Sequence, residues 1–505
     1  MMRKLFRLLS SRLFWFALLM LMQFVLLVVG VFYISNNYYV LLFFLATSLF
    51  AALFVATRDE SPDYKLAWML IIVVFPLAGG VLYLIFGKKK IGRVAVRKIL
   101  LTRDIARYKE DMELVDGQED LARTESRQMS YIHSMTGFAP WRDSGVRYYA
   151  YGDDFMKDLI DDIRSARNFI FIEYFIIGRG LMWETILEEL ARKRAEGVSI
   201  RIIYDDLGSI SAVPINYFRT LRSMGFEAYT FNPIALHMNP RLNYRDHRKI
   251  FNIDGNVCYT GGLNLADEYV NAKVRFGYWK DNAVRIEGPA VWNFTLMFLS
   301  VWRGLSRRDE DYESYRPTVK MPSDGYVQPF ADSPFDDNAV ARNVYIQAIN
   351  NARRYVWIVT PYLILDSDMT TALSISAASG VDVRIVCPHY ADKKSVHEVT
   401  RSVYRKLVAS GVRIYEYWPG FIHSKTLVAD DRMALVGTAN LDYRSFFLHF
   451  ELSVLFMGGS VVDEVKRDTQ YALQRSVEQT EEELMKVSFV RRLVRTFFGF
   501  FAPAL

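Results

Sequence analysis

The sequence has few of the residues that build disulfide frameworks and metal sites. Its 505 residues include two cysteines, Cys258 and Cys387, so at most one disulfide can form. Both lie in apolar, strand-like segments, which favours two buried free thiols. The seven histidines form no H-E-x-x-H motif, and no paired C-x-x-C motifs occur. The composition therefore argues against a zinc site, and we expect neither a metal nor a cofactor.

Hydrophobic residues make up 51% of the chain, and their excess is concentrated near the N-terminus. Three nearly uncharged runs, 13–34, 39–56 and 66–86, each approach the roughly 20 residues that span a bilayer as a helix. A signal peptide is the alternative for the first run. That run, however, lacks a small-residue cleavage site and is followed at once by another apolar run. We expect two or three membrane helices in an anchoring region covering residues 1–90.

Basic residues on both sides of this region leave its orientation open. Basic clusters favour the cytoplasmic side, and three full spans cannot place both of them there. The link at 35–37 and the Pro76–Gly80 segment are two places where a helix could break or turn back. We expect the remainder of the chain to be cytoplasmic. The two clusters are Arg3, Lys4, Arg7 and Arg12, and Lys88, Lys89, Lys90, Arg93, Arg97 and Lys98.

After a polar linker at 91–130, helix and strand patterns occur twice. An amphipathic helix leads into an apolar strand at 169–176, and residues 338–364 repeat that order. Two further units of helix, glycine stop and strand follow in each half. The repeat predicts two α/β domains with parallel-rich sheets, at 131–320 and 321–485, and then an amphipathic tail at 486–505. The first helix should bury Phe155, Leu159, Ile160 and Ile163.

The same H-x-K-x-x-x-x-D motif appears once in each half. It reads "HRKIFNID" from His247 and "HSKTLVAD" from His423, 176 residues later. Alternation along a strand places His247 and Lys249 on one face, and likewise His423 and Lys425. Two halves packed face to face could bring both motifs to one shared site. The motif aspartates, Asp254 and Asp430, fall at an odd offset and project to the opposite face, so we interpret them as structural.

A second pair of motifs, "GGLN" and "GTAN", follows at matching offsets. Asn264 and Asn440 each lie seventeen residues after their motif histidine, with Gly262 and Thr438 two residues earlier. Small residues let a ligand approach the backbone, and an amide can bind a non-bridging phosphate oxygen. We expect these four residues to bind substrate phosphate. Two histidines and two lysines suit a phosphodiester, since one neutral imidazole can attack phosphorus while the other donates a proton to the leaving alcohol.

Together these motifs resemble the signature of the phospholipase D superfamily over residues 130–460. Several surrounding blocks, including "NYRDHRKIFNIDG", "TGGLNLADEY" and "VGTANLDYRSF", are similar to those of bacterial cardiolipin synthases. "KLAWMLIIVVFPLAGGVLYLIFGKK" resembles their last membrane segment. The resemblance implies N-terminal transmembrane helices followed by two tandem phospholipase D-like α/β domains that share one active site. The catalytic motif residues would be His247, Lys249, Asp254, His423, Lys425 and Asp430.

The resemblance also implies a reaction and a location. A phosphatidyl group would pass from one phosphatidylglycerol to another through a phosphohistidine on His247, giving cardiolipin and glycerol without a metal. The partners would be phosphatidylglycerol and an anionic phospholipid membrane rather than nucleic acid. The protein would be a multi-pass protein of the bacterial inner membrane. The net charge of +6 suits an anionic partner, although nucleic acid is possible on charge alone.

Five further family positions carry an acid or a departure from the family pattern. In the family, a carboxylate downstream of each motif orients that motif's histidine, and Asp281 and Glu451 match those positions; the alternative is an ordinary surface or core-edge acid. Glu173 matches another family acid whose role stays open. His449 replaces an asparagine usual in the family and could affect binding selectivity, and Leu365 replaces a proline usual after "PY".

Two other functions stay open on the sequence. With water as the acceptor, the same site would be a phosphodiesterase hydrolysing phospholipid or nucleic acid, which its product would reveal. A membrane scaffold with a decayed site is the alternative outside enzymes, and the retention of both motifs counts against it. The arginine- and phenylalanine-rich C-terminal tail is either an interfacial amphipathic helix or a core-packing terminal helix. The oligomeric state is not predicted.

Overall fold

A computed structural model describes residues 38–58, 62–75, 79–80, 123–233, 243–335 and 338–500, with Leu18, Leu21, Met22, Val25, Tyr83 and Tyr108. The chain divides into two units. One contains residues 1–91, and the other contains nearly all the rest and both motifs. The latter is called the catalytic unit below. Most of the hydrophobic run at 13–34, part of that at 66–86, both N-terminal basic clusters and most of the linker lie outside the described residues.

The N-terminal unit contains two packed helices, α3 (Tyr38–Ala56) and α4 (Pro62–Val74). The hydroxyl of Ser48 donates to the carbonyl of Ile72 at 2.8 Å, and Val55 and Trp68 join the buried core between them. Across the part of the chain that is described, no helix is both long and apolar enough to cross a membrane. The expected membrane helices therefore stay a prediction.

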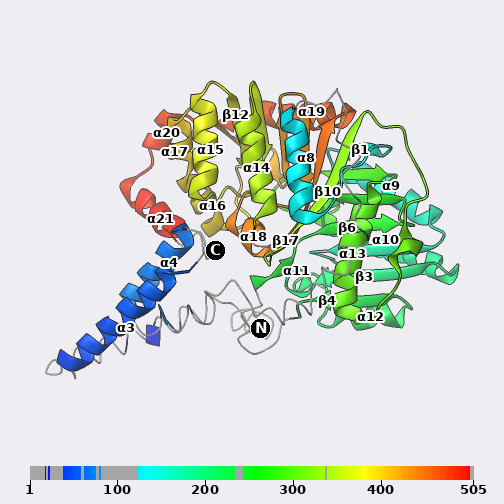
Figure 1. Ribbon diagram of the computed structural model, residues 1–505, viewed down its shortest axis with the longest axis horizontal. Helices are drawn as coiled ribbons and strands as arrows, with labels where there is room; N and C mark the ends of the chain where they lie inside the picture. Colours follow the sequence, from blue (N-terminus) through cyan, green and yellow to red (C-terminus); the bar gives the residue numbers. More distant parts are fainter. Residues whose placement is uncertain are drawn as a thin grey trace. The chain divides into compact units, whose positions relative to one another are not determined.

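The first half of the catalytic unit is a seven-stranded sheet in the order β1-β9-β7-β6-β2-β3-β4. Helix α13 covers one face, and α9 and α10 cover the other (Figure 1). Its elements are β1 (Gly145–Tyr149), α9 (Gly152–Ser165), β2 (Phe169–Tyr174), α10 (Leu181–Ala195), β3 (Ser199–Asp205), α11 (Asp206–Ser209), α12 (Tyr217–Ser223), β4 (Glu227–Phe231), β5 (Arg245–Asp246), β6 (Lys249–Ile253), β7 (Val257–Gly261), η5 (Asp267–Val270), β8 (Tyr278–Lys280), β9 (Ala283–Glu287), α13 (Val291–Ser306) and η6 (Tyr312–Tyr315).

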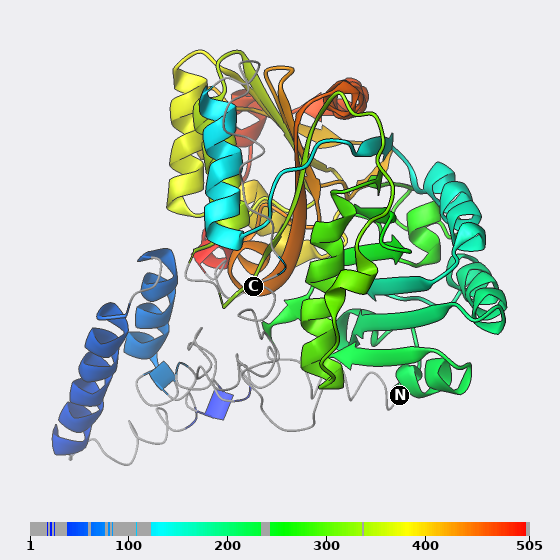
Figure 2. The same cartoon turned by 45° about the vertical axis from the view of Figure 1, so that its right-hand side comes forward.

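The second half repeats this plan in a sheet with the order β10-β17-β16-β15-β11-β12-β13-β18. Helices α14 and α15 lie on one side of it and α19 on the other (Figure 2). Its elements are β10 (Gly325–Asp332), α14 (Val340–Asn351), β11 (Tyr355–Val359), α15 (Ser367–Ala378), β12 (Asp382–Pro388), α16 (Lys394–Ser402), α17 (Tyr404–Ala409), β13 (Arg413–Tyr417), β14 (Gly420–Ile422), β15 (Thr426–Ala429), β16 (Met433–Gly437), α18 (Tyr443–Phe447), β17 (His449–Gly458), α19 (Ser460–Gln474), β18 (Ser476–Glu478), α20 (Glu481–Met485) and α21 (Phe489–Phe500).

The repeated helix pattern predicted from the sequence is confirmed. Helix α9 buries the four expected apolar residues, Phe155, Leu159, Ile160 and Ile163. The glycines after the repeated helices adopt positive φ, where an L side chain would be strained. They are Gly197 and Gly225 in the first half and Gly380 and Gly411 in the second. Both cysteines are free and buried, as expected.

The expectation of parallel-rich sheets is wrong, because both sheets are mixed. Strands β2, β3 and β4 are parallel to one another, as are β11, β12 and β13. The strands that follow each motif pair antiparallel instead. A parallel pairing needs a long crossover, usually a helix, whereas β6 joins β7 and β15 joins β16 through tight turns. The motifs therefore lie on the antiparallel side of each sheet.

One helix that precedes the first half in sequence packs on the second half. Helix α8 (Arg123–Thr136) precedes the first half, yet it lies beside α14 of the second half (Figure 2). The amide of Gln128 donates to the carbonyl of Val344 at 3.1 Å. The chain then continues to β1 of the first half, and on the way Trp141 forms a β-bridge with Val327 of β10, in the second half. Helix α8 and the bridge at Trp141 thus join the two halves in addition to the contacts at the motifs.

The motif aspartates hold turns at the far ends of the motif strands. Both have positive φ, and Asp254 accepts hydrogen bonds of 2.7, 2.7 and 2.8 Å from the backbone N–H groups of residues 167–169. Asp430 does the same for residues 353–355. Five strand residues, or about 16 Å, separate Asp254 from the histidine end of its strand. Their placement among the catalytic residues is therefore corrected, and the structural interpretation agrees with these contacts.

We predict that Asp254→Ala destabilises the fold without changing the chemistry. Three backbone N–H groups lose a charged acceptor at the start of β2, which should lower the free energy of unfolding by roughly 1 to 3 kcal/mol. Thermal unfolding and specific activity per folded molecule are the measurements. Asp161→Ala, in an exposed ion pair of α9, is the control and should change neither. A large loss of turnover in folded Asp254→Ala protein would contradict the structural role.

Candidate active site

Two short strand pairings join the halves at the motifs. Strand β5 of the first half runs parallel to β17 of the second, and β14 of the second runs parallel to β8 of the first. The N–H of His247 then donates to the carbonyl of Phe450 at 2.9 Å, and that of His423 to the carbonyl of Lys280 at 2.7 Å. The backbone of each half therefore positions the motif histidine of the other half.

The same crossing pairs each histidine with a carboxylate of the opposite half. His247 Nδ1 lies 2.9 and 3.0 Å from the carboxylate oxygens of Glu451, and His423 Nδ1 lies 2.6 Å from Oδ2 of Asp281. The expectation that each carboxylate orients the histidine of its own motif is wrong. Asp281 follows β8 directly and Glu451 lies in β17, and these are the strands on which the opposite motif docks. Both carboxylates are fully buried.

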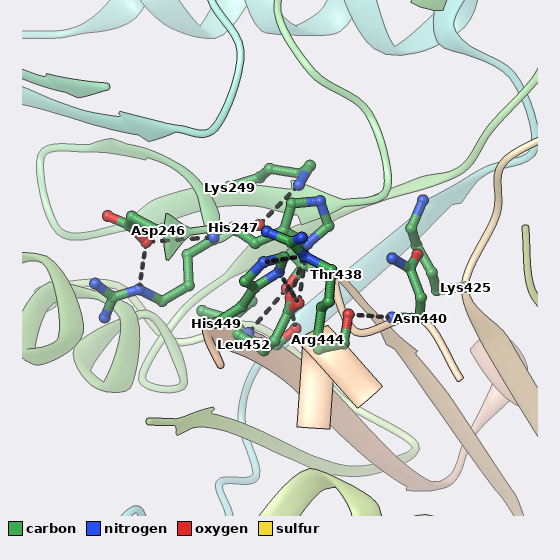
Figure 3. Close-up of polar contacts among 12 residues, drawn as sticks. Asp246, His247, Lys249, Lys425, Thr438, Asn440, Arg444, His449 and Leu452 are labelled. Atoms are coloured by element: carbon green, nitrogen blue, oxygen red, sulfur yellow. Dashed lines mark hydrogen bonds and ion pairs between the residues drawn. The ribbon is translucent and has the colours of Figure 1, made fainter. Parts of the chain in front are cut away.

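The two motif lysines lie beside their histidines and are fully buried. Lys249 Nζ donates to the carbonyl of His247 at 2.7 Å, and Lys425 Nζ donates to the carbonyl of His423. Lys425 Nζ also lies 2.7 Å from Nδ1 of His423. Residues of both halves meet here (Figure 3): Asp246, His247 and Lys249 from the first, and Lys425, Thr438, Asn440, Arg444 and His449 from the second.

Burial dominates the proton affinities of these groups. It lowers the pKa of Lys249 to about 7, with a further contribution from the charge of Lys425, and it lowers the pKa of Lys425 to about 8. Burial also lowers the pKa of His247 to about 3, against the Glu451 charge, and that of His423 to about 4. Both imidazoles are therefore neutral at neutral pH. A bound phosphodiester anion would raise all four pKa values.

The motif asparagines already make contacts inside the protein. Asn264 accepts from the N–H of Ile176 at 3.1 Å and donates to the hydroxyl of Tyr269 at 2.8 Å. Asn440 donates to Oδ2 of Asp442 at 3.1 Å. An amide nitrogen carries two hydrogens, so each asparagine has at most one N–H left for a substrate oxygen. Phosphate binding by Asn264 and Asn440 thus stays a prediction, with at most one N–H donor available from each side chain.

Gly262 and Thr438 contact the carboxylates, and their binding of substrate phosphate stays a prediction. A Cβ at Gly262 would lie 1.9 Å from Oδ1 of Asp281, so that position must be glycine for the carboxylate to fit. Thr438 donates its hydroxyl to Oε2 of Glu451. Both residues therefore help to position a carboxylate behind a histidine.

The surroundings of Glu451 include two residues whose roles the motifs did not define. His449 Nδ1 lies 3.5 Å from Oε1 of Glu451, and Arg444 Nε donates to Nε2 of His449 at 3.4 Å. Although burial alone would raise it, the nearby His247 holds the pKa of Glu451 well below its usual value. The position of Arg444 in the "VGTANLDYRSF" block was the available sequence signal, whereas its contact with His449 depends on the fold.

The two halves differ at the residue packed on the motif histidine. Trp279 precedes Asp281 by two residues, and its ring centroid lies 5.3 Å from that of His423. His449 holds the corresponding position before Glu451, 5.6 Å from the ring of His247. The site is thus symmetric in its motifs and asymmetric in its lining.

Glu173 supports the residues on either side of the first motif histidine. Its carboxylate lies 2.6 Å from Arg248, which also donates to Asp246 at 3.0 Å. Burial raises the pKa of Glu173 well above its usual value, and the Arg248 charge opposes that shift. Glu173 therefore fixes the backbone segment that carries His247.

One group of described residues could hold a metal ion. Ligand atoms of His247, His449 and Glu451 lie within 4.8 Å of one another. Glu451 already accepts from His247, and the charges of Lys249 and Arg444 act on the two histidines. A cation entering this group would meet those like charges, whereas an imidazole oriented by a carboxylate needs no cation.

The fold and this site are those of a phosphatidyl-transferring class of protein. A family profile described as "Cardiolipin synthase, PLD-like domain" matches residues 159–292 and 345–472, and one described as "Phospholipase_D-nuclease N-terminal" matches residues 46–88. A phosphatidylserine synthase structure from Haemophilus influenzae is similar in fold, with a TM-score of 0.57 and 15% identity, covering 76% of this chain and 98% of that one.

Relatives in sequence identify the family within this class. "Cardiolipin synthase 2" of Staphylococcus epidermidis is 33% identical over 88% of this chain and 93% of its own length. A Streptococcus mutans protein described only as uncharacterized is 40% identical over 87% of this chain and 96% of its own. The chain belongs to the cardiolipin synthase family of tandem phospholipase D-like domains.

We predict that the crossed pairs respond to substitution across the halves. Glu451→Gln should change the imidazole ¹⁵N shifts of His247 and lower its pKa further, because the carboxylate charge that raised it is gone. Asp281→Asn should do the same to His423. Histidine-labelled protein has seven histidines to assign, and the control Asp161→Asn should shift neither. Turnover should fall roughly 10²- to 10⁴-fold in either variant. A response of His423 to Glu451→Gln would contradict the pairing.

Proposed function

We propose that this chain transfers a phosphatidyl group from one phosphatidylglycerol to another, giving cardiolipin and glycerol. The observation that carries the proposal is the pair of neutral, buried histidines, each backed by a carboxylate, with a lysine beside each. Family membership supports the same reaction. Two imidazoles are what a two-step displacement at phosphorus requires, one to form a covalent bond and one to move the proton.

In the first step, Nε2 of His247 attacks the phosphorus of phosphatidylglycerol. Glu451 engages Nδ1, so the proton stays there and the Nε2 lone pair is available. The bond from phosphorus to the headgroup oxygen breaks as the new bond to nitrogen forms. His423, charged by proton uptake when the anionic substrate binds, gives its Nε2 proton to the departing oxygen. Glycerol leaves, and the phosphatidyl group stays on His247.

In the second step, a second phosphatidylglycerol takes the place of glycerol. His423, now neutral, removes the proton from its terminal headgroup hydroxyl. That oxygen attacks phosphorus, the bond to His247 breaks, and cardiolipin is released. With water in place of the second lipid, the product would be phosphatidate. Selectivity for lipid therefore depends on excluding water from the intermediate.

Lys249 and Lys425 would neutralise the non-bridging oxygens during both steps. Stabilising that charge is usually the largest contribution to such a reaction. Their pKa values, lowered to about 7 and 8 by burial, rise when the anion binds, so the substrate itself favours the charged lysines. The remaining N–H groups of Asn264 and Asn440 would add hydrogen bonds.

For the rest of the chain we propose an anchoring region at 1–90, a linker at 91–130, domains at 131–320 and 321–485 and a tail at 486–505. The hydrophobic runs of the N-terminal region support multi-pass attachment to a bacterial inner membrane, with the catalytic unit on the cytoplasmic side. The N-terminal family match at 46–88 falls in the same region.

We predict that the purified full chain in liposomes converts phosphatidylglycerol alone to cardiolipin, with about one glycerol released per cardiolipin, as the two displacement steps require. Mass spectrometry of the lipids and an enzymatic glycerol assay are the measurements. Chelators should have little effect. Each single variant, His247→Ala or His423→Ala, should abolish turnover, since attack and leaving-group protonation both belong to the first step.

The same assay separates the alternatives. Phosphatidate as the main product would establish the hydrolase and contradict the transferase. Strict loss of activity in chelator, restored by a divalent ion, would contradict a reaction that needs only protein groups. Asp161→Ala, in an exposed ion pair of α9, serves as the matched control and should keep full activity.

A further inference from the structure

The apolar side chains of the C-terminal helix α21 face away from the catalytic unit. Phe489, Val490, Leu493, Val494 and Phe497 are 40% to 69% exposed. At 100° per residue they occupy one arc of about 140° on the helix. A surface helix ordinarily turns its apolar stripe toward the core, and a patch of this kind marks an interaction site.

The opposite side of α21 is fixed to the protein by charge. Arg491 lies 2.6 Å from Oε1 of Glu398 in α16, and Arg495 lies 2.9 Å from Oε2 of the same carboxylate. A Cβ at Gly499 would lie 3.3 Å from the hydroxyl of Ser402, also in α16, so glycine permits the close contact. Arg495 is buried in this contact. The helix is thus held with its polar face inward and its apolar face outward.

The rim of the apolar face carries positive charge. Arg492, within α21, is exposed, whereas Lys486, just before the helix, is exposed but lies 2.8 Å from Oε1 of Glu482. The segment 486–499 contains no aspartate or glutamate. An apolar arc with a cationic rim is the arrangement that binds in the headgroup region of an anionic bilayer.

We propose that the outward face of α21 lies in the interface of an anionic phospholipid bilayer and orients the second half of the catalytic unit on that surface. The sequence left the tail open between an interfacial helix and a core-packing helix, and the exposed apolar arc favours the former. The two arginine contacts to one carboxylate make α21 a fixed part of that half. This proposal does not depend on the reaction assigned above.

A second copy of the chain is the other occupant that this face could take. A two-fold contact through this face would bring Arg492 of both copies to one apolar centre, where like charges repel. Anionic headgroups would neutralise the same residues. The rim therefore favours lipid over self-association.

The test uses single cysteines on the full chain. The native Cys258 and Cys387 are fully buried, so a maleimide fluorophore will label an introduced exposed cysteine selectively. Leu493→Cys and Phe497→Cys report on the apolar arc, and Asp161→Cys on α9 is the matched exposed control. Each labelled protein is placed in nanodiscs of phosphatidylcholine with phosphatidylglycerol, made with or without brominated acyl chains. Brominated lipid should quench the two α21 labels by at least about twofold and leave the α9 label unchanged.

Four results would overturn the proposal. Unquenched, water-like emission at both α21 positions would show that the face is in solvent. Blue-shifted emission without quenching would show that protein covers it, and a disulfide between copies of the Leu493→Cys chain would identify a second copy. If quenching is as strong in discs of phosphatidylcholine alone, and in Arg492→Gln protein, as in the original discs, then anionic lipid is not needed for binding.

Discussion

The site depends on the exchange of short strands between the two halves. Strand β5 leaves the first sheet to pair with β17, and β14 leaves the second to pair with β8. These pairings set the position of both motif histidines through the backbone and bring each to the carboxylate of the opposite half. In neither half does the motif histidine pair with a carboxylate of the same half, so a single copy of the domain lacks this pairing. Two copies of the domain are therefore needed to form the crossed pairs.

This exchange also lets the site hold several ionisable groups away from water. Burying a charge is costly unless it is paired, and two carboxylates and two lysines are buried here beside two imidazoles. The carboxylates are compensated, because each has a histidine and further hydrogen bonds from Thr438 or the N–H of Asn282. The lysines are compensated less, as the lowered pKa values of Lys249 and Lys425 show. In the proposed reaction a phosphodiester anion supplies the missing partner, so substrate binding and lysine protonation would support each other.

Much of the fold follows from local pattern. The apolar spacing in α9, the glycine stops and the two H-x-K pairs depend on neighbouring residues, so the sequence defines them. The crossed pairing does not, because a duplicated motif reads the same whether Asp281 serves His247 or His423. The contacts of Gly262 and Thr438 with the carboxylates were not predicted for a related reason: their offsets from the histidines are regular, but the atoms they contact come from β17 and from Asp281, which follows β8. The motif strands end in turns that Asp254 and Asp430 hold. Each of these carboxylates accepts hydrogen bonds from three backbone N–H groups that are distant in sequence, so local pattern does not reveal them.

The most direct test uses a phosphatidyl ester with a nitrophenolate leaving group, which needs little protonation. His423→Ala protein should form a covalent phosphatidyl adduct that mass spectrometry, after a basic quench, maps to the peptide containing His247. In that background Asp281 has lost its partner while Glu451 keeps its own. Adding Glu451→Gln should therefore slow adduct formation roughly 100-fold, whereas adding Asp281→Asn should leave it nearly unchanged. Slowing by Asp281→Asn but not by Glu451→Gln, or an adduct on His423 in the wild type, would contradict the crossed site.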